Sequence, residues 1–456
     1  VYNTEQATSL TVPVQGSAGL QVIFGTAPIH LAKDPAAAVN TPKLVYSYKE
    51  AVEAVGYSDD FENFTLCQSI SACFQVFNVA PIILVNVLDP NKAAHVTQNQ
   101  AESCDVVDGV VLYDKKYVLL NTLAVKNGSA TLVAGSDYEA AHEDDGSVAI
   151  TLLSTAAKEA SSLTVSSTSL KPSGVTAADI VGGVDASTGK ETGLELIRQI
   201  YPTLGMVPGL ILAPGWSHTP TVAAALQAKT ENINGNFKCS CLLDLSADSD
   251  GAVVYTSVKG AKEALGASSA HAAALWPMVA VGEKKYYFSA MFAALTAYTD
   301  ANNADVPYES PSNKDLRITA TVLKDGTTVA LDQQQANDVL NANGVITAIN
   351  ANGFKSWGNN TAAYPSTTDP KDRWWAVRRF FDWDGNNFIQ TYFQKVDKPG
   401  NKRLIQSIVD SQNIIGNGYV ARDYCAGYRV EFRSDENPVT NLLAGHLTTH
   451  PGRCVW

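Results

Sequence analysis

Strongly apolar segments that recur between helix-forming stretches constrain the fold of this chain more than any other feature. They read PIILVNV at 81–87, GLILAP at 209–214, KCSCLLDL at 238–245 and LWPMVAV at 275–281. Segments this apolar are typical of strands buried on both faces of a sheet. Helical patterns separate the later ones, at 220–230, 256–265 and 288–301. Such alternation predicts a parallel sheet with crossover helices, and therefore an α/β domain.

The N-terminal part is expected to begin this domain. Residues 20–28 (LQVIFGTAP) predict a strand that runs into a turn, and Ser47 with Glu50 forms a capping box ahead of a helix. A second helix is predicted from one apolar stripe, made of Cys67, Ile70, Phe74 and Phe77. Before this domain, residues 8–14 (TSLTVPV) are β-prone and are expected to form an extended arm.

Between the two α/β stretches, residues 96–183 have a different composition. Ser, Thr, Val, Ala and Gly dominate, and short alternating segments are separated by turn residues. This pattern predicts a small β-rich domain inserted into the α/β domain. Residues 94–184 hold eleven acidic and five basic side chains, so the insertion is expected to be exposed and acidic.

From about residue 364 the chain becomes aromatic and less acidic. The segment DRWWAVRRFFDWDGNNFIQTYFQKV predicts an amphipathic helix with Val377, Phe381, Phe388 and Tyr392 on one face. Residues 366–456 carry twelve basic and ten acidic side chains, whereas residues 1–365 carry 21 basic and 35 acidic ones. The excess of acidic side chains is therefore confined to the first four fifths of the chain. The arginines of this segment are expected on a solvated helix face and its tryptophans in a core. The alternative is that these residues form a protein interface.

Composition excludes several functions. The net charge of −12 argues against nucleic-acid binding and against coating of anionic membranes. The longest apolar run, residues 80–88, is too short to cross a bilayer. Neither a phosphate-binding loop nor a dinucleotide fingerprint is present, so no cofactor is expected. Only 17% of residues are charged, which favours a subunit that self-associates.

The motif GWSHTP is the strongest hint of catalysis. It places Ser217 beside His218 in a strand-to-helix loop, as a serine hydrolase would require a nucleophile near a base. Thr219 replaces the second glycine of a nucleophile elbow, and adjacent side chains point apart. A helix-capping loop is therefore favoured, and a hydrolase remains the alternative.

Metal and thiol chemistry are also disfavoured. Cys239 and Cys241 lie on one face of an apolar strand and are expected to be buried and inert. The seven cysteines lack regular spacing, which favours a reduced site of synthesis. His446, His450 and Cys454 have a spacing that a helix would align for zinc, but the threonines and proline between them favour a strand and turn.

Three stretches carry a resemblance to a known family. The succession NGVITAINANGFKSWGNNT (343–361), DRWWAVRRFFDWD and NPVTNLLAGHLTTH (437–450) resembles the tail sheath proteins of contractile bacteriophages and related injection machines. SAGLQVIFGTAP and PIILVNV near the N-terminus are also similar to that family. The resemblance implies a structural protein rather than an enzyme, which forms a helical sleeve around a tail tube and contracts to drive the tube through a cell envelope.

The resemblance also implies partners and sites. The partners would be further copies of the chain, the tail tube protein, and the baseplate and tail terminator proteins, without nucleic acid or membrane binding. The location would be the virion tail, after assembly in the host bacterial cytoplasm. Terminal extensions would add strands to neighbouring subunits, and both ends of this chain are expected to be trimmed versions of them. The arm candidates are Thr8, Leu10, Val12 and Val14. The candidates for tube or inter-subunit contacts are Arg373, Arg378, Arg379, Lys395, Lys398, Lys402 and Arg403.

The expected fold class is α/β and α+β, in several domains. The boundaries are an N-terminal arm at 1–20, an α/β domain at 21–95 and 184–364, an inserted outer β domain at 96–183, and a C-terminal α+β assembly domain at 365–456. The arm is expected to complete the assembly domain, which would face the tube. Besides the hydrolase, the alternative function is a glycan-binding surface protein that uses the β insertion.

Overall fold

A central mixed sheet of eight strands organises the fold, in a computed structural model that describes residues 18–397, 402–443 and 448–454. In spatial order the strands are β2 (Lys43–Val45), β3 (Ile82–Asn86), β1 (Gln21–Gly25), β13 (Leu210–Leu212), β14 (Ser240–Asp244), β15 (Ala272–Leu275), β19 (Val345–Asn350) and β20 (Phe354–Trp357). The six inner strands run parallel, while β2 and β20 close the edges antiparallel. The mixed α/β class expected from the sequence is thereby confirmed.

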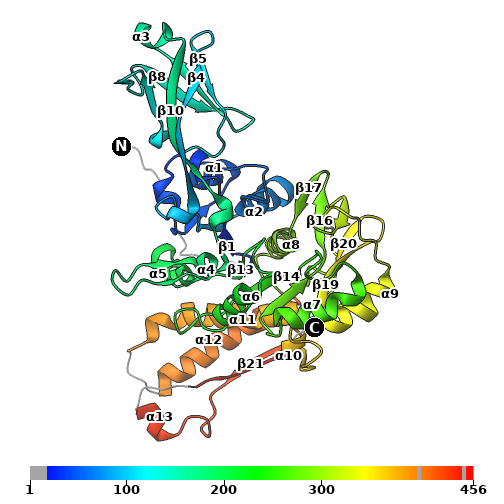
Figure 1. The fold of residues 1–456 in the computed structure, drawn as a ribbon. Helices are drawn as coiled ribbons and strands as arrows, with labels where there is room; N and C mark the ends of the chain where they lie inside the picture. The colour runs from blue at the N-terminus through cyan, green and yellow to red at the C-terminus, as the bar shows by residue number, and fades with distance from the viewer. Residues whose placement is uncertain (1–17, 398–401, 444–447, 455–456) are drawn as a thin grey trace, which may run out of the picture.

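Helices cover the sheet and connect its parallel strands (Figure 1). They are α1 (Tyr48–Val55), α2 (Leu66–Ile70), α4 (Ala177–Val181), α5 (Ile197–Leu204), α6 (Pro220–Thr230), α7 (Val258–Leu265), α8 (Phe288–Asn302) and α9 (Gln333–Gln335). The predicted capping box is only half formed: Ser47 caps α1 by accepting a hydrogen bond from the Glu50 amide, but the Glu50 side chain accepts one from the amide of Tyr46 and not from that of Ser47. The predicted stripe after Cys67 is divided, because the chain winds into a π-helix over Ser71–Phe77.

One expected strand is two strands in different sheets. The apolar segment 275–281 contains the end of β15 and then β16 (Met278–Val281). β16 pairs antiparallel with β17 (Lys284–Tyr286) and β18 (Ala320–Val322). Pro277 has no amide hydrogen to donate to a ladder, so the chain leaves the central sheet there. Because residues 275–281 are apolar throughout, their sequence does not reveal where β15 ends and β16 begins.

A β-rich segment stands at one end of the molecule, at the top of Figure 1. Its strands are β4 (Val96–Asp105), β5 (Val110–Tyr113), β6 (Ala124–Asn127), β7 (Ala130–Thr131), β8 (Tyr138–His142), β9 (Val148–Leu152) and β10 (Ser162–Leu170), with a short helix α3 (Thr155–Lys158). They form a sheet in the order β4-β10-β6-β7 and another in the order β5-β9-β8. The segment has its own core, which includes Val111, Tyr113, Ile150 and Val165. The short strands β11 (Gly183–Val184) and β12 (Glu191–Thr192) follow it.

An aromatic contact joins this β-rich segment to the α/β body. The His30 ring lies 5.2 Å from His142 and 5.6 Å from Tyr117, measured between centroids. Tyr117 also meets Phe64 edge-on and donates a hydrogen bond of 2.6 Å to Asp60. Burial and the neighbouring His142 lower the pKa of His30 to about 3, so the His30 imidazole in this contact is neutral.

The C-terminal part lies at the opposite end of the molecule (Figure 1). It contains α10 (Pro370–Arg373), α11 (Trp375–Tyr392), α12 (Lys402–Ala421), β21 (Gly427–Glu431), α13 (Val439–Leu443) and β22 (His450–Cys454). β21 and β22 form a two-stranded antiparallel sheet. A separate apolar cluster, including Phe380, Trp383, Val409 and Tyr428, holds α11, α12 and β21 together.

Candidate assembly site

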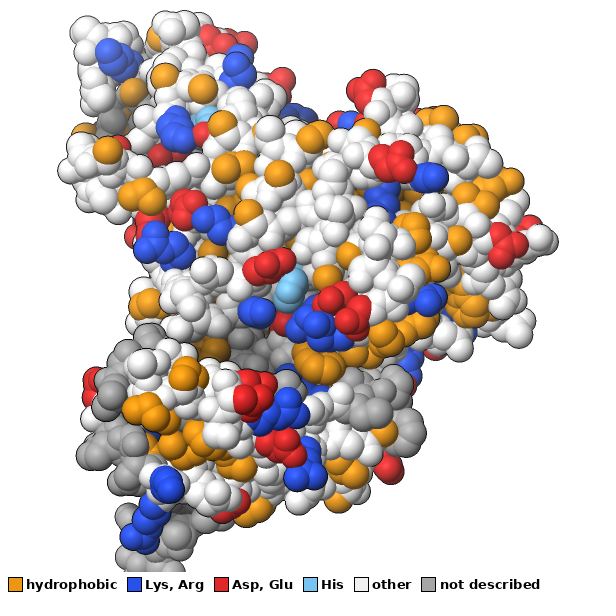
Figure 2. All heavy atoms as spheres, turned by 90° about the horizontal axis from the view of Figure 1, so that it is seen from below, with side chains coloured by type: hydrophobic (Ala, Val, Ile, Leu, Met, Phe, Trp, Pro, Cys, Tyr) orange, Lys and Arg blue, Asp and Glu red, His pale blue; other side chains and the backbone are white. Residues whose placement is uncertain are grey.

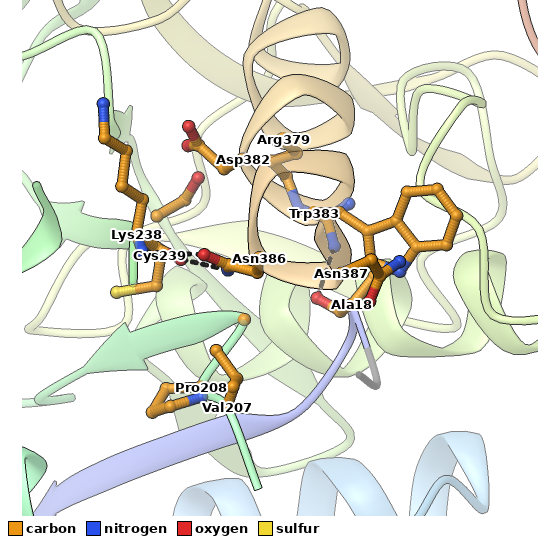
Figure 3. A pocket seen from close by; sticks show the side chains of 12 residues that line it. Ala18, Val207, Pro208, Lys238, Cys239, Arg379, Asp382, Trp383, Asn386 and Asn387 are labelled. Carbon is orange, nitrogen blue, oxygen red and sulfur yellow. Dashed lines mark hydrogen bonds between the residues drawn. The ribbon is translucent and has the colours of Figure 1, made fainter. Parts of the chain in front are cut away.

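Helix α11 joins the C-terminal part to the α/β body through buried polar side chains. Arg379 on this helix donates one hydrogen bond of 3.2 Å to Asp300 of α8 and a second to the other oxygen of the same carboxylate. A third bond, of 2.9 Å, reaches the carbonyl of Ala18 (Figure 3). The side chains of Arg379 and Asp300 are only 2% and 1% exposed. Arg379 therefore joins α11 to α8 and to the segment that leads into β1.

The same face of α11 makes two further polar contacts. One turn after Arg379, Asp382 lies 2.8 Å from the ring nitrogen Nδ1 of His271, which precedes β15. Another turn on, Asn386 accepts a 3.0 Å hydrogen bond from the backbone amide of Lys238 and donates one of 2.6 Å to its carbonyl. Arg379, Asp382 and Asn386 line a narrow cavity between α11 and the sheet, together with Lys238 and Cys239 (Figure 3). Spacings of three to four residues place all three α11 side chains on one face.

The buried face of α11 differs from the sequence prediction. Val377, Phe381, Phe388 and Tyr392 are only half-buried, whereas the polar face packs on the sheet. The prediction failed because charged residues normally face water, and these have partners far away in the sequence. One signal was available in the sequence: Asp300 is a single carboxylate near the end of the apolar helix 288–301.

A second polar cluster fixes the two-stranded sheet onto α11 and α12. The hydroxyl of Tyr428, in β21, donates a 3.0 Å hydrogen bond to Asp384 and accepts one of 2.6 Å from Gln412. Arg453, in β22, lies 2.5 Å from the same Asp384 carboxylate. Burial raises the pKa of Asp384 against the opposing effect of Arg453. Gly416 of α12 leaves room for Tyr428, because an added Cβ would lie 1.9 Å from its ring.

The structure places the seven basic contact candidates in different surroundings. Arg378 and Arg379 are buried, 9% and 3% exposed, and Arg378 pairs with Asp372 and Asp382 at 3.0 Å each. Arg373 is half-buried between the rings of Tyr364 and Trp374. The exposed candidates are Lys395, Lys402 and Arg403. Lys398, Thr8, Leu10, Val12 and Val14 lie outside the described residues.

Several large apolar side chains of the C-terminal part face solvent. Phe393 and Val396 flank Lys395 and are each 60% exposed, while Ile414 of α12 is 71% exposed. Seen from below, apolar side chains gather in patches between interspersed acidic and basic ones (Figure 2). Contiguous apolar patches, unlike single exposed apolar residues, are typical of surfaces that contact other proteins.

Ser217 and His218 do not form a nucleophile and base. The Ser217 side chain is fully buried and donates a 2.8 Å hydrogen bond to Asp244, at the end of β14. Asp244 also accepts a 2.8 Å bond from the Ser289 amide in the first turn of α8, while His218 stacks on Tyr287. Burial raises the pKa of Asp244 to about 6. Ser217 therefore helps an internal carboxylate to cap α8.

The other chemical motifs also take structural positions. Cys239 and Cys241 are buried free thiols, and burial raises the pKa of both. Residues 450–454 form β22 rather than a helix, and His446 lies outside the described residues. Within the described ranges, no three His, Cys, Asp or Glu side chains are grouped to hold a metal. No described helix is long and apolar enough to span a membrane.

Comparisons with known proteins give the same family along nearly the whole chain. No family model matches. The tail sheath protein of Burkholderia phage BcepMu is 27% identical over 437 residues, which cover 93% of this chain and 87% of the phage protein. A putative prophage major tail sheath protein of Pseudomonas aeruginosa is 30% identical over 42% of this chain and 47% of its own. The chain is a homologue of phage tail sheath proteins.

Solved structures of contractile injection systems share the fold. A chain of the anti-feeding prophage baseplate has a TM-score of 0.57 at 15% identity, covering all of this chain and 94% of its own. A contracted sheath of an extracellular contractile injection system also gives 0.57, at 13% identity, covering all of this chain and 93% of its own. The sequence similarity to phage and prophage tail sheath proteins confirms the recognition of this family from the sequence, and with it a structural rather than an enzymatic role. Neither the hydrolase nor the glycan-binding alternative finds support among these relatives.

Proposed function

We propose that the chain is the repeating subunit of a contractile sheath, which forms a helical sleeve around a tail tube and contracts to drive the tube through a host envelope. The observation that carries the proposal is similarity to sheath proteins, in sequence over 93% of the chain and in fold over all of it. A contact that joins different surfaces of two copies produces an open helix when it does not close into a ring. This is the geometry of a sleeve.

Contraction in this proposal is a rigid-body rearrangement of subunits between two packings. The polar face of α11 supports it, because the buried pair of Arg379 and Asp300 resists separation of the C-terminal part from the α/β body. Breaking a buried pair on one side costs about 3–5 kcal/mol. Contacts between subunits can therefore change while each subunit moves as one piece. Neither a nucleotide nor another fuel is required.

We also propose an orientation and a division of the subunit. The less acidic C-terminal part, residues 365–456, faces the tube as the assembly domain, and the acidic insertion at 96–183 faces outward. Lys395, Lys402 and Arg403 are exposed and keep their role as candidate contacts with the tube or a neighbour, whereas the internal contacts of Arg378 and Arg379 make them weaker candidates.

Baseplate and terminator proteins would contact the ends of the sleeve, after assembly in the host bacterial cytoplasm. Residues 8–14 would link copies by strand addition, because backbone hydrogen bonds join chains without requiring particular side chains.

Negative-stain electron microscopy of the purified chain tests the proposal. Hollow helical tubes are expected, either alone or on added tail tubes. Reversing the charge of Lys395, Lys402 and Arg403 together is expected to reduce tube formation while leaving the circular dichroism spectrum unchanged. A matched triple reversal at exposed Lys33, Lys158 and Lys190 should assemble normally. Monodisperse subunits under all conditions, with or without tail tubes, would contradict the proposed function.

A further inference from the structure

A cavity lies at the carboxyl ends of two parallel strands, β1 and β13, which are neighbours in the central sheet (Figure 1). The chain leaves β1 towards β2 and β3 on one side, and it leaves β13 towards β14 on the other. Connections that diverge in this way leave a crevice, and open α/β sheets bind ligands at such a crevice. Thr26, directly after β1, and Gly215, shortly after β13, line the cavity, whose volume is about 650 Å³. This volume is typical of sites for small molecules.

Three parts of the molecule form the walls of this cavity. Lining residues within 59–68 and 215–218 belong to the α/β body, and those within 278–287 belong to the sheet of β16 and β17 or follow it directly. Lining residues within 172–175 belong to the chain that returns from the β-rich segment. A ligand in the cavity would contact all three parts, so its binding should stabilise their relative positions.

Aromatic rings form part of the wall. The lining includes Phe61, Trp216, His218 and Tyr287. The His218 and Tyr287 rings lie parallel, with their centroids 5.6 Å apart. Trp216 is only half-buried, and aromatic faces, tryptophan above all, attract cations. The Lys284 ammonium group already lies 5.8 Å from the centroid of Phe61. The wall therefore suits a ligand that combines an apolar body with positive charge.

The lysines at the cavity have partners within the chain. Lys284 Nζ lies 2.6 Å from a carboxylate oxygen of Asp59. Lys324 Nζ lies 3.4 Å from a carboxylate oxygen of Asp248. Lys285 donates a 2.6 Å hydrogen bond to the backbone carbonyl of Lys324. Because these contacts already satisfy the ammonium groups, the lysines offer little to an anionic ligand.

Two exposed carboxylates at the cavity, those of Glu62 and Glu283, form no ion pair within the residues that the structure describes. The charge of Glu62 also reaches the wall. Burial, together with the nearby carboxylates of Asp244, Asp248 and Glu62, raises the pKa of the Tyr287 hydroxyl. The wall beside Tyr287 is therefore under the influence of negative charge, which favours a cation there and opposes an anion.

We infer that this cavity binds an organic cation, whose apolar part packs on Trp216 and whose ammonium or guanidinium group faces Glu62 and Glu283. Such a ligand matches both features of the site, because an aromatic face and unpaired carboxylates attract the same charge. The charged group can belong to a free amine or to a lysine or arginine side chain of another protein, since the chemistry is the same. The inference is independent of the proposed function, whose contact candidates lie in the C-terminal part.

Calorimetric titration of the full chain with three ligands of similar shape tests the charge. Phenethylamine carries the cation, phenethyl alcohol replaces it with a neutral hydroxyl, and phenylpropionate replaces it with an anion. The amine should bind with a Kd of about 1 mM or below, the alcohol at least tenfold more weakly, and the acid without measurable affinity. Salt at about 0.5 M should weaken binding of the amine, since it screens exposed carboxylates. Binding of the alcohol or the acid as tight as that of the amine would overturn the inference.

Titration with acetyl-arginine amide separates the two sources of the cation. Tighter binding of this compound than of phenethylamine would favour a protein side chain as the occupant, and weaker binding would favour a free amine. Either order supports the inferred chemistry. No binding of either compound at about 10 mM, ten times the expected Kd, would overturn the inference.

Substitutions test whether the ligand occupies this cavity. Glu62→Gln combined with Glu283→Gln keeps the shape of both side chains and removes their charges, so the affinity for phenethylamine should fall at least tenfold. Glu139→Gln combined with Glu159→Gln, on the exposed surface of the β-rich segment, is the matched control and should bind like the parent. Trp216→Leu should also weaken binding, because it removes the aromatic face. Circular dichroism checks the folding of each variant. Parental affinity in the folded Glu62→Gln, Glu283→Gln variant would place the ligand elsewhere and overturn the inference.

Discussion

Replacement of Arg379 by methionine should be among the most damaging single changes in the C-terminal part. The variant leaves the Asp300 carboxylate with 1% exposure and no cation, and removes the donor to the Ala18 carbonyl. The buried carboxylate would take up a proton, which at pH 7 costs about 4 kcal/mol for a group with an unfolded pKa near 3.9. The lost hydrogen bond adds about 1 kcal/mol. We expect the free energy of unfolding to fall by about 4–5 kcal/mol.

Urea denaturation followed by tryptophan fluorescence measures this loss, because Trp375 stacks under Arg379. The penalty should shrink as the pH falls from 7 towards 4, since the unfolded carboxyl is then increasingly protonated as well. Arg379→Met combined with Asp300→Leu should recover all but about 1–2 kcal/mol, because replacing both partners avoids the unpaired charge. Arg403→Met, on the surface of α12, is the matched control and should change stability by less than about 0.5 kcal/mol. A loss below about 1 kcal/mol at pH 7, or one independent of pH, would refute this reasoning.

Three further changes test other parts of the structure. Because the folded pKa of His30 is lowered to about 3, the unfolded chain binds more protons below about pH 6.5. Stability should therefore decrease from that pH down to about 3, by about 2 kcal/mol at pH 5, and thermal melting of the parent and of His30→Phe should show that the variant loses much of this dependence. Gly416→Ala should lower the melting temperature, because its Cβ would clash at 1.9 Å, whereas Gly418→Ala in the same helix meets no atom within 4 Å and should raise it slightly. Ser217→Ala should lower stability by about 1–3 kcal/mol through the lost bond to Asp244, and ester hydrolysis by the parent alone would contradict its structural role.

The sequence predicted those elements whose periodicity is set locally. The helices expected at 220–230, 256–265 and 288–301 correspond to Pro220–Thr230, Val258–Leu265 and Phe288–Asn302. The buried strands around 209–214 and 238–245 are present as β13 and β14. In these segments the apolar pattern and the secondary structure have the same cause, which is burial of one face or of both.

Long-range partners were the part that the sequence could not supply. The buried face of α11 contains Arg379, Asp382 and Asn386, and each residue is stable there only because a matching group lies elsewhere in the chain. Apolar periodicity assigns such residues to the surface. The same limit applies to Asn413, whose bonds to the edge of β21 could not be read from an ordinary helix sequence. Ser217 was expected in a loop that caps the helix after it, but no side-chain hydrogen bond caps α6, and Ser217 instead bonds Asp244, a partner that was not foreseen.

The register of β4 and β10 has a practical consequence for engineering. Val96, where the β-rich segment begins, is paired with Leu170, where it ends, so the chain leaves and returns to the α/β body at neighbouring backbone positions. Any folded domain whose own termini lie side by side could be grafted between these two residues without stretching the body. A tail built from such subunits would display one copy of the grafted domain per subunit, at the regular spacing of the sleeve.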